Sequence, residues 1–101
     1  MNAKTELLDI LYGQANTLCA EIKTKKDKTI ILKQNYSQED WDNFAKELDF
    51  DYNNSSGDQF IHGTVWLQDN SWLKRIYMVG NFSSIEYWGV RQRPEIPEHL
   101  F

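Results

Sequence analysis

The sequence predicts an α+β domain: an antiparallel sheet of about four strands with two helices packed on one face. Two observations lead to this prediction. An apolar stripe with helical period runs through residues 38–48, and three apolar segments of strand length fill residues 59–91. Because short turns separate these segments, they are expected to form a three-stranded antiparallel meander.

Length and composition indicate one globular domain. The chain has 101 residues, so residues 1–101 are expected to form a single domain with its own core. Aromatic residues make up 14% of the chain, enough to ask whether some rings are exposed for binding. The net charge of −4 argues against general attraction to nucleic acid or to an anionic membrane.

The N-terminal segment allows two interpretations. Residues 3–22 have helical spacing, and the helix is expected most firmly over residues 4–14. Gly13 weakens such a helix by about 1 kcal/mol relative to alanine. Residues 17–24 could instead form a strand that pairs with the next segment across a lysine-rich turn. The stripe consists of Leu8, Leu11, Ala15, Leu18 and Ile22.

The next two elements are a strand and a helix. Residues 29–33 are rich in β-branched side chains and predict a strand. Ser37 is the expected N-cap of a helix over residues 38–48. Asp40 stands where a capping box prefers Glu or Gln, so an imperfect box is expected. The buried stripe of this helix should be Trp41, Phe44, Ala45 and Leu48.

A loop over residues 52–59 precedes the meander. The strands are expected at 59–68, 71–79 and 84–91, with turns at Asp69-Asn70 and Gly80-Asn81. Neither face of these strands is cleanly polar. Either the helices cover one face and a partner covers the other, or the sheet is covered on both sides. Pro94 and Pro97 stiffen an extended C-terminal segment, which Ile96, Leu100 and Phe101 could anchor to the body.

The sequence offers little catalytic chemistry. A nucleophile and base would have to combine Cys19 or a serine with His62 or His99. Cys19 lies in an apolar stripe, His62 in mid-strand and His99 in the C-terminal segment, and this spacing does not match a zinc site. We therefore predict a protein that is not an enzyme and uses no metal or cofactor.

One segment begins like a calcium-binding loop. Residues 49–53 match the D-x-D-x-N start, but Asn54 replaces the glycine of position six and Phe60 the glutamate of position twelve. A solvated loop that follows a helix is the preferred interpretation. The single cysteine, the lack of an apolar secretory segment and the lack of a membrane span favour a cytoplasmic setting.

Charge is segregated along the chain. Residues 37–58 have seven acidic side chains against one lysine, a net charge of −6, whereas residues 23–33 have +4 and residues 72–93 have +3. These could be solvated faces, or an acidic surface that docks on a basic partner. The predicted partner-binding set has two parts. Acidic residues would steer the partner, and aromatic and arginine residues would form the contact. The members of the set are Glu39, Asp40, Asp42, Glu47, Asp49, Asp51, Trp66, Trp72, Arg75, Tyr87, Trp88 and Arg91.

The last 40 or so residues resemble small accessory proteins encoded by tailed bacteriophages. The similarity rests on Gly63-Thr64-Val65-Trp66-Leu67, Asp69, Ser71-Trp72-Leu73 and Arg75, then Glu86-Tyr87-Trp88 and Pro94-Glu95-Ile96-Pro97. The chain departs from that pattern at Asn70, where glycine is expected, and by an insertion over residues 78–83. The resemblance implies a non-catalytic phage product that acts in the host cytoplasm. Such a product would bind and inhibit a host protein or a defence complex, as anti-CRISPR and anti-restriction inhibitors do.

Two other functions stay open. The arginine and aromatic residues of the C-terminal sheet could stack the bases of single-stranded nucleic acid, although the acidic net charge argues against it. The protein could also be a structural or assembly accessory. The sequence also allows a symmetric homodimer through an exposed sheet face or edge.

Overall fold

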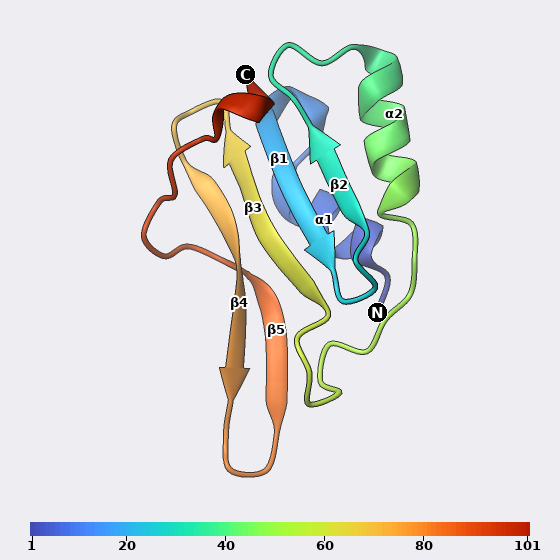
Figure 1. The fold of residues 1–101 in the computed structure, drawn as a ribbon, viewed down its shortest axis with the longest axis vertical. Helices are drawn as coiled ribbons and strands as arrows, with labels where there is room; N and C mark the ends of the chain where they lie inside the picture. The colour runs from blue at the N-terminus through green and yellow to red at the C-terminus, as the bar shows by residue number, and fades with distance from the viewer.

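The computed structural model describes residues 1–101 and has one five-stranded antiparallel sheet with two α-helices (Figure 1). In chain order the elements are α1 (Ala3–Leu11), β1 (Thr17–Thr24), β2 (Thr29–Leu32), α2 (Gln38–Glu47), β3 (Ile61–Leu67), β4 (Trp72–Val79) and β5 (Ser84–Gly89). The strand order is β2-β1-β3-β4-β5. The α+β prediction is therefore confirmed, with one strand more than the four expected. Neither helix has the length and apolar character needed to cross a membrane.

The additional strand is β1, so the helical interpretation of residues 15–22 is wrong and the strand alternative is correct. The helix ends because Tyr12 and Gly13 adopt positive φ angles of 57° and 109°. β1 then runs through the middle of the sheet, between β2 and β3, and most of its side chains are buried. Pairing with a strand on each side outweighs the helical spacing of the apolar residues in this segment.

Helix α2 begins with a complete capping box, contrary to the imperfect one expected. The hydroxyl of Ser37 accepts from the Asp40 backbone N–H at 3.0 Å, and the Asp40 carboxylate accepts from the Ser37 N–H at 3.0 Å. Trp41, Phe44 and Leu48 then reach the core. The shorter aspartate side chain therefore also closes the box.

The main core lies between the helices and one face of the sheet. Figure 1 shows α1 behind the sheet and α2 alongside β2. Side chains from α1, α2, β1, β2, β3, β4 and β5 meet there in one apolar cluster. Its members include Leu7, Leu11, Ala20, Ile22, Ile30, Leu32, Phe44, Leu48, Ile61, Val65, Leu73 and Trp88.

The C-terminal segment covers part of the opposite face. Leu100 packs with Cys19 and Trp66 in a second, smaller apolar cluster. The Trp66 indole N–H donates to the Pro94 carbonyl at 2.9 Å, and the Gln34 backbone N–H donates to the Leu100 carbonyl at 2.7 Å. Leu100 is thus an anchor, as expected, whereas Phe101 is exposed. The chain itself covers this part of the second face.

The β4–β5 hairpin projects from the body of the molecule (Figure 1). β3 pairs with β4 only from Thr64↔Lys74 to Trp66↔Trp72, whereas β4 and β5 stay paired as far as Val79↔Ser84. The Gly80 N–H donates to the Ser83 carbonyl at 2.7 Å and closes the turn. The hairpin beyond Arg75 therefore has no neighbouring strand except its own partner.

Candidate protein-interaction surface

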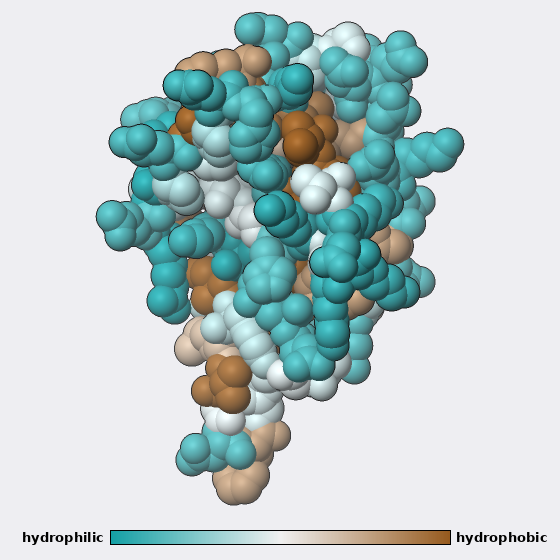
Figure 2. All heavy atoms as spheres, viewed as in Figure 1, coloured by the Kyte–Doolittle hydropathy of each residue, from teal (hydrophilic) through white to brown (hydrophobic).

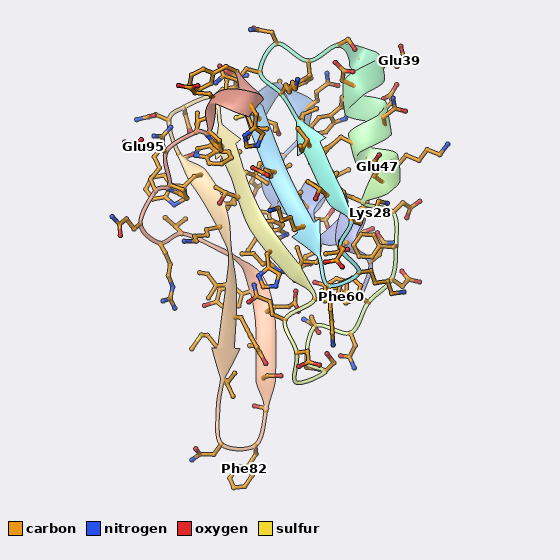
Figure 3. The ribbon with its side chains drawn as sticks, viewed as in Figure 1. Lys28, Glu39, Glu47, Phe60, Phe82 and Glu95 are labelled. Carbon is orange, nitrogen blue, oxygen red and sulfur yellow. The ribbon has the colours of Figure 1, made fainter.

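The end of this hairpin is apolar and exposed. We call residues 78–85 the hairpin tip; none of them is charged. Phe82 is fully exposed, and Val79 is 73% and Met78 50% exposed. Figure 2 shows apolar side chains on the projecting end of the molecule, and Figure 3 shows Phe82 at its extremity. A fully exposed aromatic ring among uncharged neighbours is typical of a binding surface.

A buried charge cluster holds the base of the hairpin. Arg75 of β4 is only 5% exposed. Its Nη2 lies 3.0 Å from Oε1 of Glu86 on β5, and its Nη1 lies 2.9 Å from Oε2 of Glu6 on α1. Nη2 also donates to the Tyr52 hydroxyl, which itself donates to the Glu6 carboxylate. One guanidinium thus joins the hairpin to α1 and to the segment that follows α2.

The same cluster binds the entrance to β3. The Glu86 carboxylate accepts from the backbone N–H groups of Phe60 at 2.6 Å and Ile61 at 2.9 Å. The Arg75 guanidinium lies over two rings, 5.6 Å from the centre of Tyr52 and 5.2 Å from that of Trp88. Each polar group of the cluster therefore has a partner, as burial of charge requires.

Burial and hydrogen bonding fix the protonation states of two residues of the cluster, Tyr52 and Arg75. Desolvation by burial, reinforced by the hydrogen bond to Glu6, raises the pKa of the Tyr52 hydroxyl far above its usual value, and Arg75 only partly offsets this. Burial by itself would lower the pKa of Arg75, but hydrogen bonding and attraction to Glu6, together with Tyr52, raise it. Tyr52 is neutral and Arg75 charged across the physiological pH range.

The loop before β3 covers the outer edge of β5. The Glu86 N–H donates to the Asn54 carbonyl at 3.0 Å, and the Gly57 N–H donates to the Ser84 hydroxyl at 2.9 Å. The Tyr77 hydroxyl donates to the Gly57 carbonyl. A second copy of the chain cannot add a strand at this edge without displacing the loop.

The acidic members of the predicted set are all exposed and lie on α2 or just after it. Several are already engaged: Asp42 accepts from Gln38 Nε2 at 3.0 Å, and Asn2 Nδ2 donates to Asp49 at 3.0 Å and Asp51 at 3.2 Å. The carboxylates of Glu39 and Glu47, near the two ends of α2 in Figure 3, have no hydrogen-bond partner in the chain. These two are the acidic groups most available to a ligand.

Three predicted contact residues lie inside the fold. Trp66, Arg75 and Trp88 are 3%, 5% and 7% exposed, so their side chains cannot form a contact surface. Trp66 packs under the C-terminal segment, and Arg75 and Trp88 belong to the base of the hairpin. Trp72 and Tyr87 are half-buried and Arg91 is exposed, so these remain accessible.

The hairpin tip was missed by sequence reasoning. The set predicted from the sequence favoured tryptophan and arginine as contact residues and omitted Met78, Val79 and Phe82. The available signal was the uncharged run at residues 78–85. Only the projection of the hairpin beyond β3 shows that this run faces solvent.

Two of the three groups considered for chemistry, Cys19 and His99, are buried or engaged. Cys19 is completely buried, and desolvation raises the pKa of its thiol to about 11, although nearby Arg93 acts in the opposite direction. His99 lies 2.9 Å from Glu21, whereas His62 is exposed on β3. No group of three or more His, Cys, Asp or Glu residues is arranged to hold a metal ion.

Comparison with protein-family models, with curated protein sequences and with solved structures gives no match, so the function has to be inferred from the surfaces and contacts described above.

Proposed function

We propose that the chain is a non-catalytic inhibitor that binds a host protein or defence complex in the host cytoplasm, with the hairpin tip as its main contact. The observation that supports this proposal is the exposed, uncharged tip with Phe82 at its end. Aromatic anchors inserted into a partner's pocket contribute much of the binding energy in protein complexes. The resemblance to phage accessory proteins supplies the biological setting.

The buried charge cluster orders the hairpin before a partner binds. Arg75 and Glu86 fix its base to α1 and to the start of β3, and Tyr77 fixes its side to Gly57. A contact element that is ordered before binding loses less conformational entropy when the complex forms. Binding through this element therefore needs no folding step.

The acidic surface has a separate role in this proposal. Exposed carboxylates on α2 and after it give one side of the molecule a negative potential. Such a potential accelerates encounter with a basic partner and makes the association rate depend on salt. Glu39 and Glu47 contribute most directly because neither is engaged elsewhere in the chain.

The nucleic-acid alternative has weaker support. It requires arginine and aromatic side chains on an open sheet face, but Arg75, Trp66 and Trp88 are buried. Of the residues it would use, Tyr87, Trp72 and Arg91 remain at the surface. An assembly accessory would instead associate with virus particles. In that case the affinity purification would recover virion proteins.

The test is affinity purification from infected host cells, with mass spectrometry to identify partners. Wild type is compared with the double variant Val79→Ser/Phe82→Ser and with Val90→Ser. Val90 is a matched control because it is 65% exposed and apolar but lies outside the hairpin. We expect a host protein to be recovered with wild type and Val90→Ser, and at least about tenfold less with the double variant, since hot-spot losses exceed 1.4 kcal/mol.

Other outcomes reject the proposal. Equal recovery with the hairpin variant would remove the tip as the contact. Recovery of virion proteins in place of a host protein would favour the assembly function. Recovery of nucleic acid that Arg91→Ala abolishes would favour the single-strand alternative.

A further inference from the structure

A groove runs between α2 and the outer edge of β2. Its volume is about 260 Å³. It is lined on the strand side by Ile31, Leu32 and Lys33, and on the helix side by Asp40, Asn43, Phe44 and Glu47 of α2. The spacing of these four α2 residues places them along one side of the helix. The hairpin tip takes no part in this groove.

Unpaired backbone groups of β2 lie at the groove. The Thr24 N–H donates to the Lys28 carbonyl at 2.9 Å, and the register continues with Ile22↔Ile30 and Ala20↔Leu32. Because pairing alternates along an antiparallel strand, the N–H and C=O of Ile31 point away from β1. β2 is the outermost strand on this side, so the Ile31 groups are free to pair with another chain.

We infer that this groove binds an extended segment of a partner protein that contains lysine or arginine. The segment would pair its backbone with Ile31, as peptides do when they extend a sheet edge. Glu47 and Asp40 would attract its basic side chain, and the Asn43 amide, which has no partner in the chain, would hydrogen-bond its backbone. The inference rests on the proposed function in one respect: the ligand is a segment of another protein.

The groove is formed before any ligand arrives. Phe44 and Leu48 anchor α2 in the core, and the capping box fixes its first turn. At the other end, the Lys28 ammonium donates to the Glu47 backbone carbonyl at 3.1 Å, which leaves the Glu47 carboxylate free. Lys28 and Glu47 are neighbours in Figure 3.

Charge selects a basic ligand over a second copy of the chain. Pairing of β2 with β2 of another molecule would bring two α2 helices together. Each helix has four acidic side chains against Lys46, and two of them, Asp40 and Glu47, line the groove against a single cation, Lys33. Like charges at close range oppose that arrangement, whereas a lysine or arginine side chain is attracted.

The test uses a short fluorescein-labelled peptide of alternating lysine and valine, and a second peptide with glutamate in place of lysine. Fluorescence anisotropy measures affinity, and NMR of isotope-labelled protein locates the contact. We expect the lysine peptide to bind at least about fivefold more tightly than the glutamate peptide. The amide signals of Ile31 and Asn43 should shift during the titration.

Matched variants separate the two contacts. Ile31→Pro removes the N–H at the groove, and Thr29→Pro removes an outward N–H of the same edge strand outside it. Edge strands tolerate proline at such positions. Ile31→Pro should weaken binding about fivefold and Thr29→Pro by less than about twofold. Glu47→Gln should weaken it, whereas Glu95→Gln should not, because Glu95 is exposed on the side of the molecule away from α2 in Figure 3. This pair keeps the test decisive if a proline variant fails to fold.

Equal affinity for both peptides, or amide shifts confined to the hairpin or to the open sheet face, would overturn the inference. Phe82→Ser should leave peptide binding unchanged. Peptide binding without capture of a host protein would reject the proposed function alone. Hairpin-dependent capture of a host protein without peptide binding would reject the groove alone.

Discussion

The Arg75 guanidinium and the Glu86 carboxylate lie 3.0 Å apart across the two strands of the hairpin, and both are buried. Arg75 is directly opposite Trp88 and Glu86 is opposite Tyr77, so the ion pair is diagonal. The diagonal contact lets Arg75 stack on Trp88 while it binds Glu86, and leaves its Nη1 for Glu6. Three segments of the chain depend on this one side chain.

Replacement of Arg75 by methionine should therefore destabilise the fold strongly. Glu6 and Glu86 would lose their shared cation, and an uncompensated buried charge typically costs about 3–5 kcal/mol. Urea unfolding monitored by circular dichroism measures the change. Lys74→Met is the control because Lys74 is exposed on the same strand, and its effect should stay within about 0.5 kcal/mol. Similar stabilities for the two variants would contradict a structural role for the cluster.

Tyr52 should make stability depend on alkaline pH. Its folded-state pKa is raised above the ordinary value of 10.0, mainly by desolvation. The neutral hydroxyl is favoured in the folded state, so its contribution is complete below pH 10 and falls as pH rises toward the folded pKa. The expected slope is about 1.4 kcal/mol per pH unit above pH 10. Tyr52→Phe should be less stable at neutral pH and show a shallower alkaline loss in urea unfolding between pH 9 and about pH 11.5.

Gly63 should not tolerate a side chain. Its φ is +137°, and a Cβ there would overlap the Glu21 carbonyl oxygen on β1. Gly63→Ala should cost about 3 kcal/mol or more, because strain and overlap add. Gly57 also has a positive φ, +96°, but a Cβ at this residue would meet no atom within 4 Å, so Gly57→Ala should cost only about 1 kcal/mol. Thermal unfolding of both variants distinguishes the packing contribution from the backbone contribution.

Cys19 should react slowly with thiol reagents. Burial raises its pKa to about 11, so at pH 8 only about one molecule in a thousand would have a thiolate even if reagent could reach it. Leu100→Ala should open the cover over Cys19 and speed labelling by Ellman's reagent. Rapid labelling of the wild type would show that the C-terminal segment does not stay on the sheet.

Local patterns predicted much of the fold. The stripe Trp41, Phe44 and Leu48 with Ser37 before it located α2 to within one residue. The turn residues at Asn70, which has φ of 71°, and at Gly80 separated the last three strands correctly. These features depend on neighbours in sequence, which is why a single sequence reveals them.

The features that could not be predicted depend on contacts between residues that are far apart in the sequence. The choice between helix and strand for residues 17–24 is decided by pairing with both β2 and β3, and the second partner lies about 40 residues away. Arg75 looked like a surface arginine because Glu6 and Tyr52 are remote in sequence. A signal did exist, since the alternation of side chains put Arg75 with Leu73 and Glu86 with Trp88, two charges among buried neighbours.

The placement of the indole rings decides what intrinsic fluorescence can report. Trp41, Trp66 and Trp88 are at most 8% exposed, Trp72 is half-buried, and none lies in residues 78–85. Emission from the native chain will follow unfolding faithfully yet change little when a ligand covers Phe82. A Phe82→Trp variant would add a solvent-exposed emitter at the end of the hairpin, and a blue shift of that emission would report docking separately from folding.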